Sequence, residues 1–295
     1  MARHRFGGAW TDDKLERIRK YLSAYTKIFR ANERARYYRT TYVDAFAGSG
    51  SRADSGKPTR TEEVALFDLG MDTDAASLKA GSARIALEVR PTFDHYAFVE
   101  RNTDRAAELE ALKLEFPERD VQIVSADANE HLRSWCLRSD WRRNRAVVFL
   151  DPYGMQVEWS TVQAIADTRA IDLWWLVPLG IGLNRLLTGN APPPPKWADA
   201  LTRSLGTEEW RNVFYAKSDE PTLFPDESVE RRIAGLERLG SFFLTRLRSV
   251  FAAVAPNPLS LLNRRNTPIY LLCFAAGNPK AAPTAIKIAK DILGR

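Results

Sequence analysis

A short motif after an apolar run carries the clearest chemical signal in this sequence. Residues 146–150 are apolar, and Asp151, Pro152, Tyr153 and Gly154 follow them directly. A carboxylate and a backbone carbonyl beside an aromatic ring can hold a planar amino group, because the oxygens accept from NH₂ while the ring stacks on its plane. We therefore expect Asp151, Pro152 and Tyr153 to be catalytic and Gly154 to contact the substrate. A proline turn with a packed tyrosine is the alternative.

A second signature is a glycine-containing loop. Residues 42–46 are rich in β-forming side chains, and Gly48, Ser49 and Gly50 follow. Glycine lets the backbone approach a ligand closely and adopts positive φ without a Cβ clash. The spacing matches neither GxGxxG followed by a helix nor GxxxxGK[ST], which disfavours a dinucleotide or a triphosphate as ligand. Taken alone, the loop could be a simple turn.

Two acidic residues stand at comparable places further along the chain. Glu100 ends the strand-like run 96–100, where a carboxylate can accept hydrogen bonds from ribose hydroxyls; a helix N-terminal acid is the alternative. Asp127 follows the run 121–124, where it could accept from an adenine amine; a helix cap is the alternative. Ligands of α/β sheets bind beyond the carboxyl ends of the strands. The order of these signatures therefore favours one shared site.

Other polar side chains could reach or assist that site. Lys14 and Tyr21 lie seven residues apart on one face of the first expected helix, so both could reach the cofactor loop, and Lys14 is expected to contact the substrate. Core or surface packing explains them equally well. Arg185 follows the fifth expected strand and could pair with a phosphate or a carboxylate of the substrate. The basic loops 142–145 and 263–266 suit phosphates. Because 142–145 precedes a strand, it is expected on the side away from the cofactor.

The elements that must position these residues alternate between strand and helix patterns. Such alternation predicts βαβ units and a mostly parallel sheet, and the apolar runs 146–150 and 173–177 fit strands buried on both faces. The expected strands cover 42–46, 96–100, 121–124, 146–150, 172–177, 257–263 and 267–275. The expected helices cover 83–89, 103–116, 129–138, 159–167, 227–251 and 282–293, besides the first one at 11–30.

We expect three parts in the chain. Residues 1–180 form a Rossmann-like core, with the helix 11–30 and a polar insertion at 51–80. Residues 181–240 break the rhythm and are expected to be an inserted cap or substrate lobe, helical or irregular. The four prolines at 192–195 within it suggest a stiff spacer. Residues 241–295 are expected to complete the core, with an antiparallel strand near the C-terminus.

Composition narrows the classes of function. The formal net charge is +6 and the pI about 9.3, which suits nucleic acid as a partner, although 43 basic against 37 acidic residues is a mild excess. The two cysteines form no CxxC pair and the three histidines lack metal-binding spacing, so no metal site is expected. Neither an export signal nor an apolar run of membrane-spanning length is visible, so a cytoplasmic protein without membrane contact is expected.

The motifs resemble those of known proteins. Residues 46–50, FAGSG, look like motif I of class I methyltransferases that use S-adenosylmethionine (SAM), and Asp151-Pro152-Tyr153 looks like a shortened DPPY motif of nucleic-acid amino-methyltransferases. Over most of its length the chain resembles the three-Cys-motif partner (TcmP) family. The matching blocks are Asp13-Lys14-Leu15 with Lys20-Tyr21-Leu22, and the runs 43–48, 149–154 and 267–274.

The resemblance implies a class I methyltransferase fold, SAM as the cofactor and a role for each matching residue. Two features differ: 56 positions separate Asp44 from Glu100, and the second proline of DPPY is missing. The implied cofactor contacts are Asp44, Ala45 and Phe46 for the methionine moiety, Gly48, Ser49 and Gly50 for the loop beneath the cofactor, Glu100 for the ribose, and Asp127 with Ala128 for the adenine. Asp151, Pro152 and Tyr153 would face the transferred methyl group.

The sequence therefore predicts a SAM-dependent methyltransferase acting on an amino group of nucleic acid or of a nucleotide-like substrate. One alternative is a SAM-binding protein without turnover that works with a neighbouring three-cysteine protein. Another is a nucleotide-modifying enzyme of a different type that uses the same pocket. SAM binding separates the first two from the third, and methyl transfer separates the first from the second.

Overall fold

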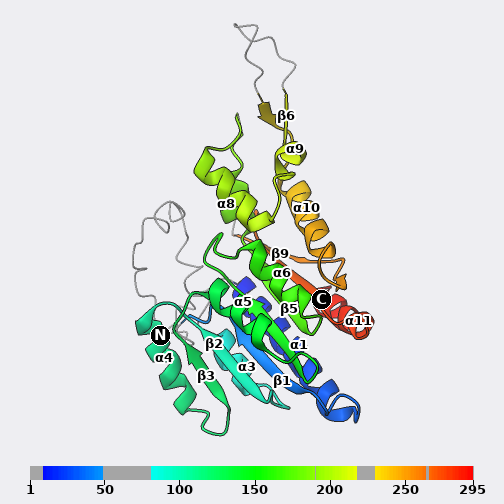
Figure 1. The fold of residues 1–295 in the computed structure, drawn as a ribbon. Coiled ribbons are helices and arrows are strands. Elements are labelled where there is room, and N and C mark those ends of the chain that lie inside the picture. The colour runs from blue at the N-terminus through cyan, green and yellow to red at the C-terminus, as the bar shows by residue number, and fades with distance from the viewer. Residues whose placement is uncertain (1–8, 49–80, 190, 218–229, 264–265, 295) are drawn as a thin grey trace, which may run out of the picture.

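The molecule is built on one mixed β-sheet (Figure 1). The computed structural model describes residues 9–48, 81–189, 191–217, 230–263 and 266–294. The sheet order is β3-β2-β1-β4-β5-β10-β8, with β9 also paired to β10. The first five strands of this order are parallel, whereas β10 is antiparallel to β5, β8 and β9. The strands are β1 (Arg39–Asp44), β2 (His95–Val99), β3 (Val121–Val124), β4 (Asn144–Leu150), β5 (Ile171–Val177), β8 (Ala253–Val254), β9 (Leu259–Leu262) and β10 (Pro268–Ala276).

Helices cover both faces of this sheet. One apolar cluster joins one face to α1 (Ala9–Ala31), α3 (Ser82–Glu88), α4 (Thr103–Leu114) and α11 (Ala282–Leu293). A second joins the other face to α5 (Ala128–Arg138), α6 (Trp159–Asp167), α8 (Pro195–Leu205) and α10 (Leu236–Arg248). β4 and β5 are buried on both sides, which explains their unbroken apolar sequences. The Rossmann-like fold class expected from the sequence, with its antiparallel strand near the C-terminus, is confirmed.

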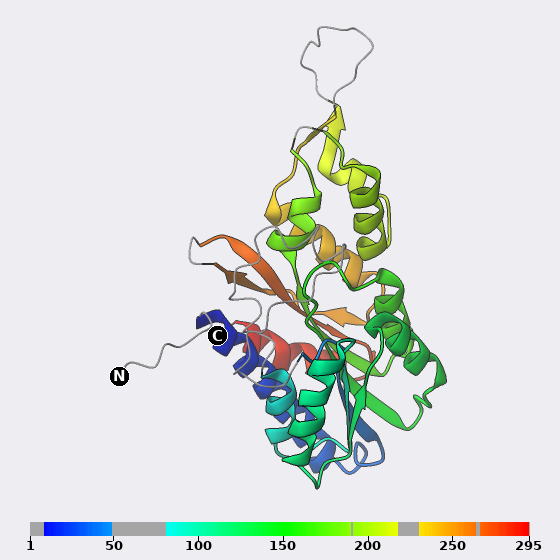
Figure 2. The ribbon, with the colours of Figure 1, turned by 90° about the vertical axis from the view of Figure 1, so that its left-hand side faces the viewer.

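A smaller group of elements projects beyond the sheet at the top of Figures 1 and 2. The chain leaves β5 through a π-helical turn, η1 (Leu179–Leu183), and the short α7 (Asn184–Leu186). It continues through α8, α9 (Trp210–Phe214) and the antiparallel pair β6 (Tyr215–Lys217) and β7 (Glu230–Arg232) before α10 returns it to the sheet. This confirms an inserted lobe that is helical with irregular parts.

Two local expectations inside this lobe were wrong. The expected helix over 227–251 is the shorter α10, because residues 230–232 pair as β7 and Gly235 precedes the first helical residue. The fourth proline, Pro195, does not continue a spacer but begins α8. Proline suits that first helical position because its missing N–H has no intrahelical partner there. For the other expected helices and strands, the observed first and last residues differ from the expected ones by a few residues at most. Strand β8 was not expected.

Part of the expected organisation lies outside the described residues. This applies to the polar insertion at 51–80 and to Ser49 and Gly50 of the glycine loop. Within the described part of the chain, no helix is long and apolar enough to cross a membrane.

Candidate functional site

Three carboxylates meet at the carboxyl edge of the parallel strands. Asp44 is the last residue of β1, and it pairs in register with Phe98 of β2 and Phe149 of β4. Glu100 and Asp151 follow those two strands within two residues of the paired positions. All three side chains belong to residues that are at most 9% exposed. Their gathering follows from parallel pairing, which aligns the ends of neighbouring strands.

The centre of this edge is a buried ion pair. Nζ of Lys14 lies 2.6 Å from Oδ2 of Asp151, and the two side chains are 0% and 6% exposed. The Lys14 ammonium also lies 5.5 Å from the centre of the Phe149 ring. Helix α1 thus delivers its lysine to the residue expected to be catalytic. Sequence spacing suggested that Lys14 could reach the cofactor loop, and the structure places it on Asp151 instead.

Asp44 is enclosed next to that pair. Burial raises the pKa of its carboxyl to about 6, and the nearby charge of Asp151 acts in the same direction, while hydrogen bonding from Ser82 and the backbone of Phe46 opposes it. The Phe46 N–H donates to Oδ1 at 3.3 Å. The other oxygen, Oδ2, has no partner of good hydrogen-bond geometry among the described residues. Asp44 is thus a fully buried carboxyl with one oxygen that lacks a well-formed hydrogen bond among these residues.

Glu100 fastens the start of the glycine loop to the strand edge. Its Oε2 accepts from the backbone N–H of Gly48 at 3.0 Å, and its Oε1 accepts from that of Asn102 at 2.9 Å. Gly48 has φ of 63°, a conformation that glycine adopts without a Cβ penalty. A carboxylate offers about four acceptor positions, so Glu100 retains acceptors for other donors. Its contact with a ribose stays a prediction.

Asp127 takes the capping position that the sequence had left open. Its Oδ1 accepts from the backbone N–H groups of Asn129 at 2.9 Å and Glu130 at 3.1 Å, at the start of α5. The adjoining Ala128 is buried as the first residue of that helix. An adenine amine would have to use the other oxygen of Asp127, and this contact also stays a prediction.

Tyr153 stands beside Asp151 under an arginine from another element. The Arg105 guanidinium lies 5.0 Å from the centre of the Tyr153 ring. Burial raises the pKa of the Tyr153 hydroxyl to about 12, and the charges of Glu100 and Asp151 contribute while Arg105 opposes them. Sequence reasoning missed Arg105. Its signal was its position as the third residue of α4, the helix that directly follows Glu100 and its strand.

Tyr270 of β10 is a second aromatic neighbour that sequence reasoning did not assign to the site. Burial raises the pKa of its hydroxyl well above the usual range, with contributions from the charges of Asp151 and Tyr153. The antiparallel strand therefore also borders this edge.

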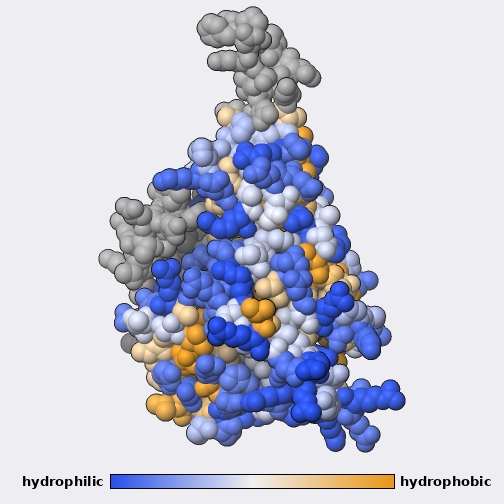
Figure 3. Space-filling view, in the orientation of Figure 1, coloured by the Kyte–Doolittle hydropathy of each residue, from blue (hydrophilic) through white to orange (hydrophobic). Residues whose placement is uncertain are grey.

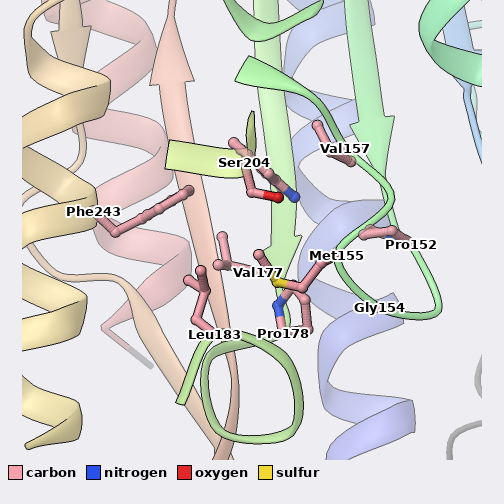
Figure 4. Close-up of a pocket in the computed structure, with 10 residues that line it drawn as sticks. Pro152, Gly154, Met155, Val157, Val177, Pro178, Leu183, Ser204 and Phe243 are labelled. Atoms are coloured by element: carbon pink, nitrogen blue, oxygen red, sulfur yellow. The ribbon is translucent and has the colours of Figure 1, made fainter. Parts of the chain in front are cut away.

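Pro152 and Gly154 line a small cavity on the other side of the motif (Figure 4). The cavity has a volume of about 10 Å³, enough for about one water molecule. Its wall is apolar apart from Ser204 of α8 and the indole N–H of Trp175, neither of which has a hydrogen-bond partner among the described residues. A cavity of this size is too small for a nucleobase unless the wall moves.

Arg185 does not join the cluster. It is exposed on α7, and in the described part of the chain it forms no ion pair with Asp44, Glu100 or Asp151. The arginine that organises this segment is Arg232 of β7. It donates to Oδ1 of Asn184 at 2.6 Å and to the backbone carbonyl of Leu187 at 2.9 Å. Among the described residues, no group of three or more His, Cys, Asp or Glu side chains could hold a metal ion.

Comparisons with known proteins agree on the fold. No family model and no curated protein matches the sequence. A solved structure, protein LPL1258 of Legionella pneumophila assigned to DUF519, aligns over 98% of this chain and 92% of its own with a TM-score of 0.51 and 13% identity. The fold is methyltransferase-like. That conclusion rests on the strand order and the antiparallel β10, and the alignment shows that LPL1258 has the same overall fold.

Two other solved structures are similar at a lower level. A SAM-dependent methyltransferase from Clostridium acetobutylicum aligns over 88% of this chain and 92% of its own, with a TM-score of 0.35 and 10% identity. A conserved hypothetical protein from Streptococcus pyogenes aligns over 52% and 74%, with a TM-score of 0.30 and 16% identity.

Proposed function

We propose that this protein is a SAM-dependent methyltransferase that acts on an amino group of nucleic acid or of a nucleotide-like substrate. The observation that carries the proposal is the pair of Lys14 and Asp151. A nitrogen donor already lies 2.6 Å from the carboxylate that the motif assigns to the substrate amine. The buried Asp151 is therefore suited to orient an amine, since it offers an anionic acceptor in a site with little water.

The residues at the edge of β1 and β2 fit the cofactor. SAM combines a sulfonium cation with ribose hydroxyls, an adenine and an amino acid group, and so needs acceptors near a closely approaching backbone. Oδ2 of Asp44, which has no hydrogen bond of good geometry among the described residues, the positive φ of Gly48 and the remaining acceptor positions of Glu100 support this assignment. We assign Asp44, Ala45, Phe46, Gly48, Ser49, Gly50, Glu100, Asp127 and Ala128 to the cofactor, as the sequence motifs imply.

Methyl transfer to an amine asks for alignment more than for acid–base catalysis. SAM, when bound, would supply an electrophilic methyl group on its sulfonium; transfer to the amine nitrogen would form the N–CH₃ bond as the S–CH₃ bond breaks, leaving S-adenosylhomocysteine and releasing one amine proton to solvent. Asp151 orients the amine, the Pro152 carbonyl accepts its second hydrogen, and Tyr153 stacks on the attached ring. Alignment of this kind lowers barriers by about 7–11 kcal/mol in favourable intramolecular reactions. We propose that the lobe of residues 181–240 covers the substrate that accepts the methyl group.

Lys14 also favours a second candidate function. Its ammonium already occupies one oxygen of the carboxylate that a substrate amine would use. A protein that binds SAM without turnover, and that works with a three-cysteine partner of the kind implied by the TcmP resemblance, would have such a filled acceptor position. In an active enzyme, Lys14 must swing away or share Asp151 with the substrate.

The two candidates are separated by methyl release from radiolabelled SAM with total RNA, DNA and cell extract as acceptors. We expect the wild-type protein to label an acceptor and Asp151→Asn to label none while binding SAM as tightly as the wild type. SAM binding without labelling of any acceptor would support the second candidate. Full labelling by Asp151→Asn would remove Asp151 from the mechanism.

A further inference from the structure

A group of arginines and tyrosines lies at the opposite end of the sheet from the candidate site. Tyr37 and Tyr38 precede β1, which begins at Arg39. Arg142 and Arg143 precede β4, whose second residue is Arg145. We call these six residues the arginine–tyrosine patch. The Arg39 N–H donates to the Arg143 carbonyl at 2.9 Å, and Arg39 pairs in register with Asn144. The pairing of β1 with β4 therefore brings two distant segments to one surface.

Arginines and tyrosines in the patch are in direct contact. The Arg145 guanidinium lies 3.9 Å from the centre of the Tyr38 ring, and that of Arg143 lies 5.5 Å from the centre of the Tyr37 ring. Nε of Arg143 also donates to the Tyr37 hydroxyl at 3.0 Å. These contacts hold long side chains in place before any ligand arrives, which lowers the entropy lost on binding.

The patch has positive charge that its acidic neighbours do not balance. Asp140 pairs with Arg142 and Asp120 with Arg39, but Arg143 and Arg145 form no ion pair with the described residues. The side chain of Arg142 is 93% exposed and Tyr37 is 61% exposed. Figure 3 shows a strongly hydrophilic surface at the lower right, where residues 31–38 lie in Figure 1. The Arg142 guanidinium and the Tyr37 ring are thus exposed to solvent on the same surface.

We propose that the arginine–tyrosine patch binds single-stranded nucleic acid. Arginines contact phosphates, and the exposed Tyr37 ring, with one guanidinium over it, offers a surface on which an unpaired base stacks. An acidic peptide would use the charge but not the ring, and the bases of a duplex are already stacked on one another. The combination of both features favours a single strand.

The patch is separate from the candidate site. Five residues of β4 stand between Arg145 and Asp151, so the two Cα atoms are about 20 Å apart along the extended chain. A bound strand would therefore be held here by its backbone, at a distance from any nucleotide at Asp151. The inference goes beyond the proposed function, because the patch binds a strand whether or not the site transfers a methyl group.

The test is fluorescence anisotropy with a labelled 20-nucleotide RNA of mixed sequence and no SAM, at several salt concentrations. We expect Arg142→Ala/Arg143→Ala to weaken binding roughly tenfold at low salt and to reduce the log–log salt slope by about 1.4, which is 0.7 for each lost phosphate contact. The matched control, Lys287→Ala/Lys290→Ala, removes two exposed charges from α11 and should change neither value. Tyr37→Ala should weaken binding at least about fivefold, and Tyr37→Phe much less.

Three results would overturn the proposal. One is a wild-type protein that does not bind the RNA, and another is an equal loss in the two double variants, which would indicate general electrostatic attraction. The third is equally tight binding of polyglutamate of the same charge. SAM binding should be unchanged in Arg142→Ala/Arg143→Ala, so loss of RNA binding in that variant with intact SAM binding would concern the patch alone and not the candidate site.

Discussion

Nζ of Lys14 and Oδ2 of Asp151 lie 2.6 Å apart although 137 residues separate them in the chain, and neither side chain is more than 6% exposed. An ion pair so deeply buried is balanced between a large desolvation cost and a strong attraction. It ties α1 to the end of β4. Both the stability of the fold and the availability of Asp151 to a substrate depend on it.

Removing only the lysine should destabilise the protein strongly. Lys14→Met leaves the Asp151 carboxylate buried without its partner, and breaking a buried pair in this way costs about 3–5 kcal/mol. The double variant Lys14→Met/Asp151→Leu should recover much of that loss, because no charge is then left unpaired. Denaturant unfolding of the wild type, both single variants and the double variant measures the coupling. A double variant as unstable as the sum of the two singles would show that the pair is not coupled.

Stability should depend on the ionisation of Asp44. Its folded-state pKa is about 6, above the ordinary 3.8, so the folded state binds the proton more tightly than the unfolded state. Below about pH 4 the Asp44 carboxyl therefore does not lower the free energy of unfolding. Its destabilising effect grows as the pH rises from about 4 to about 6 and is constant above that. From the shift, the full penalty is about 3 kcal/mol.

Asp44→Asn should remove this penalty. Its unfolding free energy relative to the wild type should rise between about pH 4 and pH 6 and then level off. Asp140→Asn is the control, because Asp140 is exposed and hydrogen bonds from Arg142 lower its pKa, which gives a dependence of opposite sign. A pH-independent difference for Asp44→Asn would contradict the burial argument.

Glu100→Gln should weaken SAM binding about 10- to 100-fold, since hydrogen bonds to a charged group contribute about 1.5–3 kcal/mol. The substitution also replaces one of the two anchors, on Gly48 and Asn102, with an amide NH₂ that cannot accept. Titration calorimetry gives the affinity. Glu110→Gln, on the exposed face of α4, is the matched control and should bind as the wild type does. Unchanged affinity in Glu100→Gln would remove this residue from the cofactor site.

The aromatic ring of Tyr153 should matter more than its hydroxyl. Burial keeps that hydroxyl protonated up to about pH 12, so it does not act as an anion at neutral pH. Tyr153→Phe should retain most of the kcat/KM for methyl transfer. Tyr153→Ala should lose about 5- to 150-fold, the range that stacking of a base on a ring contributes. A larger loss in Tyr153→Phe than in Tyr153→Ala would point to the hydroxyl instead.

Local patterns were sufficient for much of the fold. The β-rich and apolar runs located all five parallel strands within a few residues, and Trp174 and Trp175 pack on opposite faces as strand geometry requires. Of the two roles expected for Asp127, helix capping and adenine binding, the structure shows the helix cap. In the lobe the local pattern was wrong, since residues 230–232 of the helix expected over 227–251 pair instead with residues 215–217.

The side-chain contacts that define the site could not be predicted from local sequence patterns. Three strand-end acids were identified by position, but the bond from Gly48 to Glu100 spans 52 residues and the contact of Arg105 with Tyr153 spans 48. No periodicity encodes which partner a side chain meets across such distances. The same is true of Lys14, whose helical face was identified while its partner was not.

Titration calorimetry of the wild-type protein with SAM tests the central claim most directly. The account predicts saturable binding of one SAM per chain, weakened at least tenfold in Glu100→Gln and unchanged in Asp151→Asn. Absence of binding to the wild-type protein would contradict a SAM site at this strand edge.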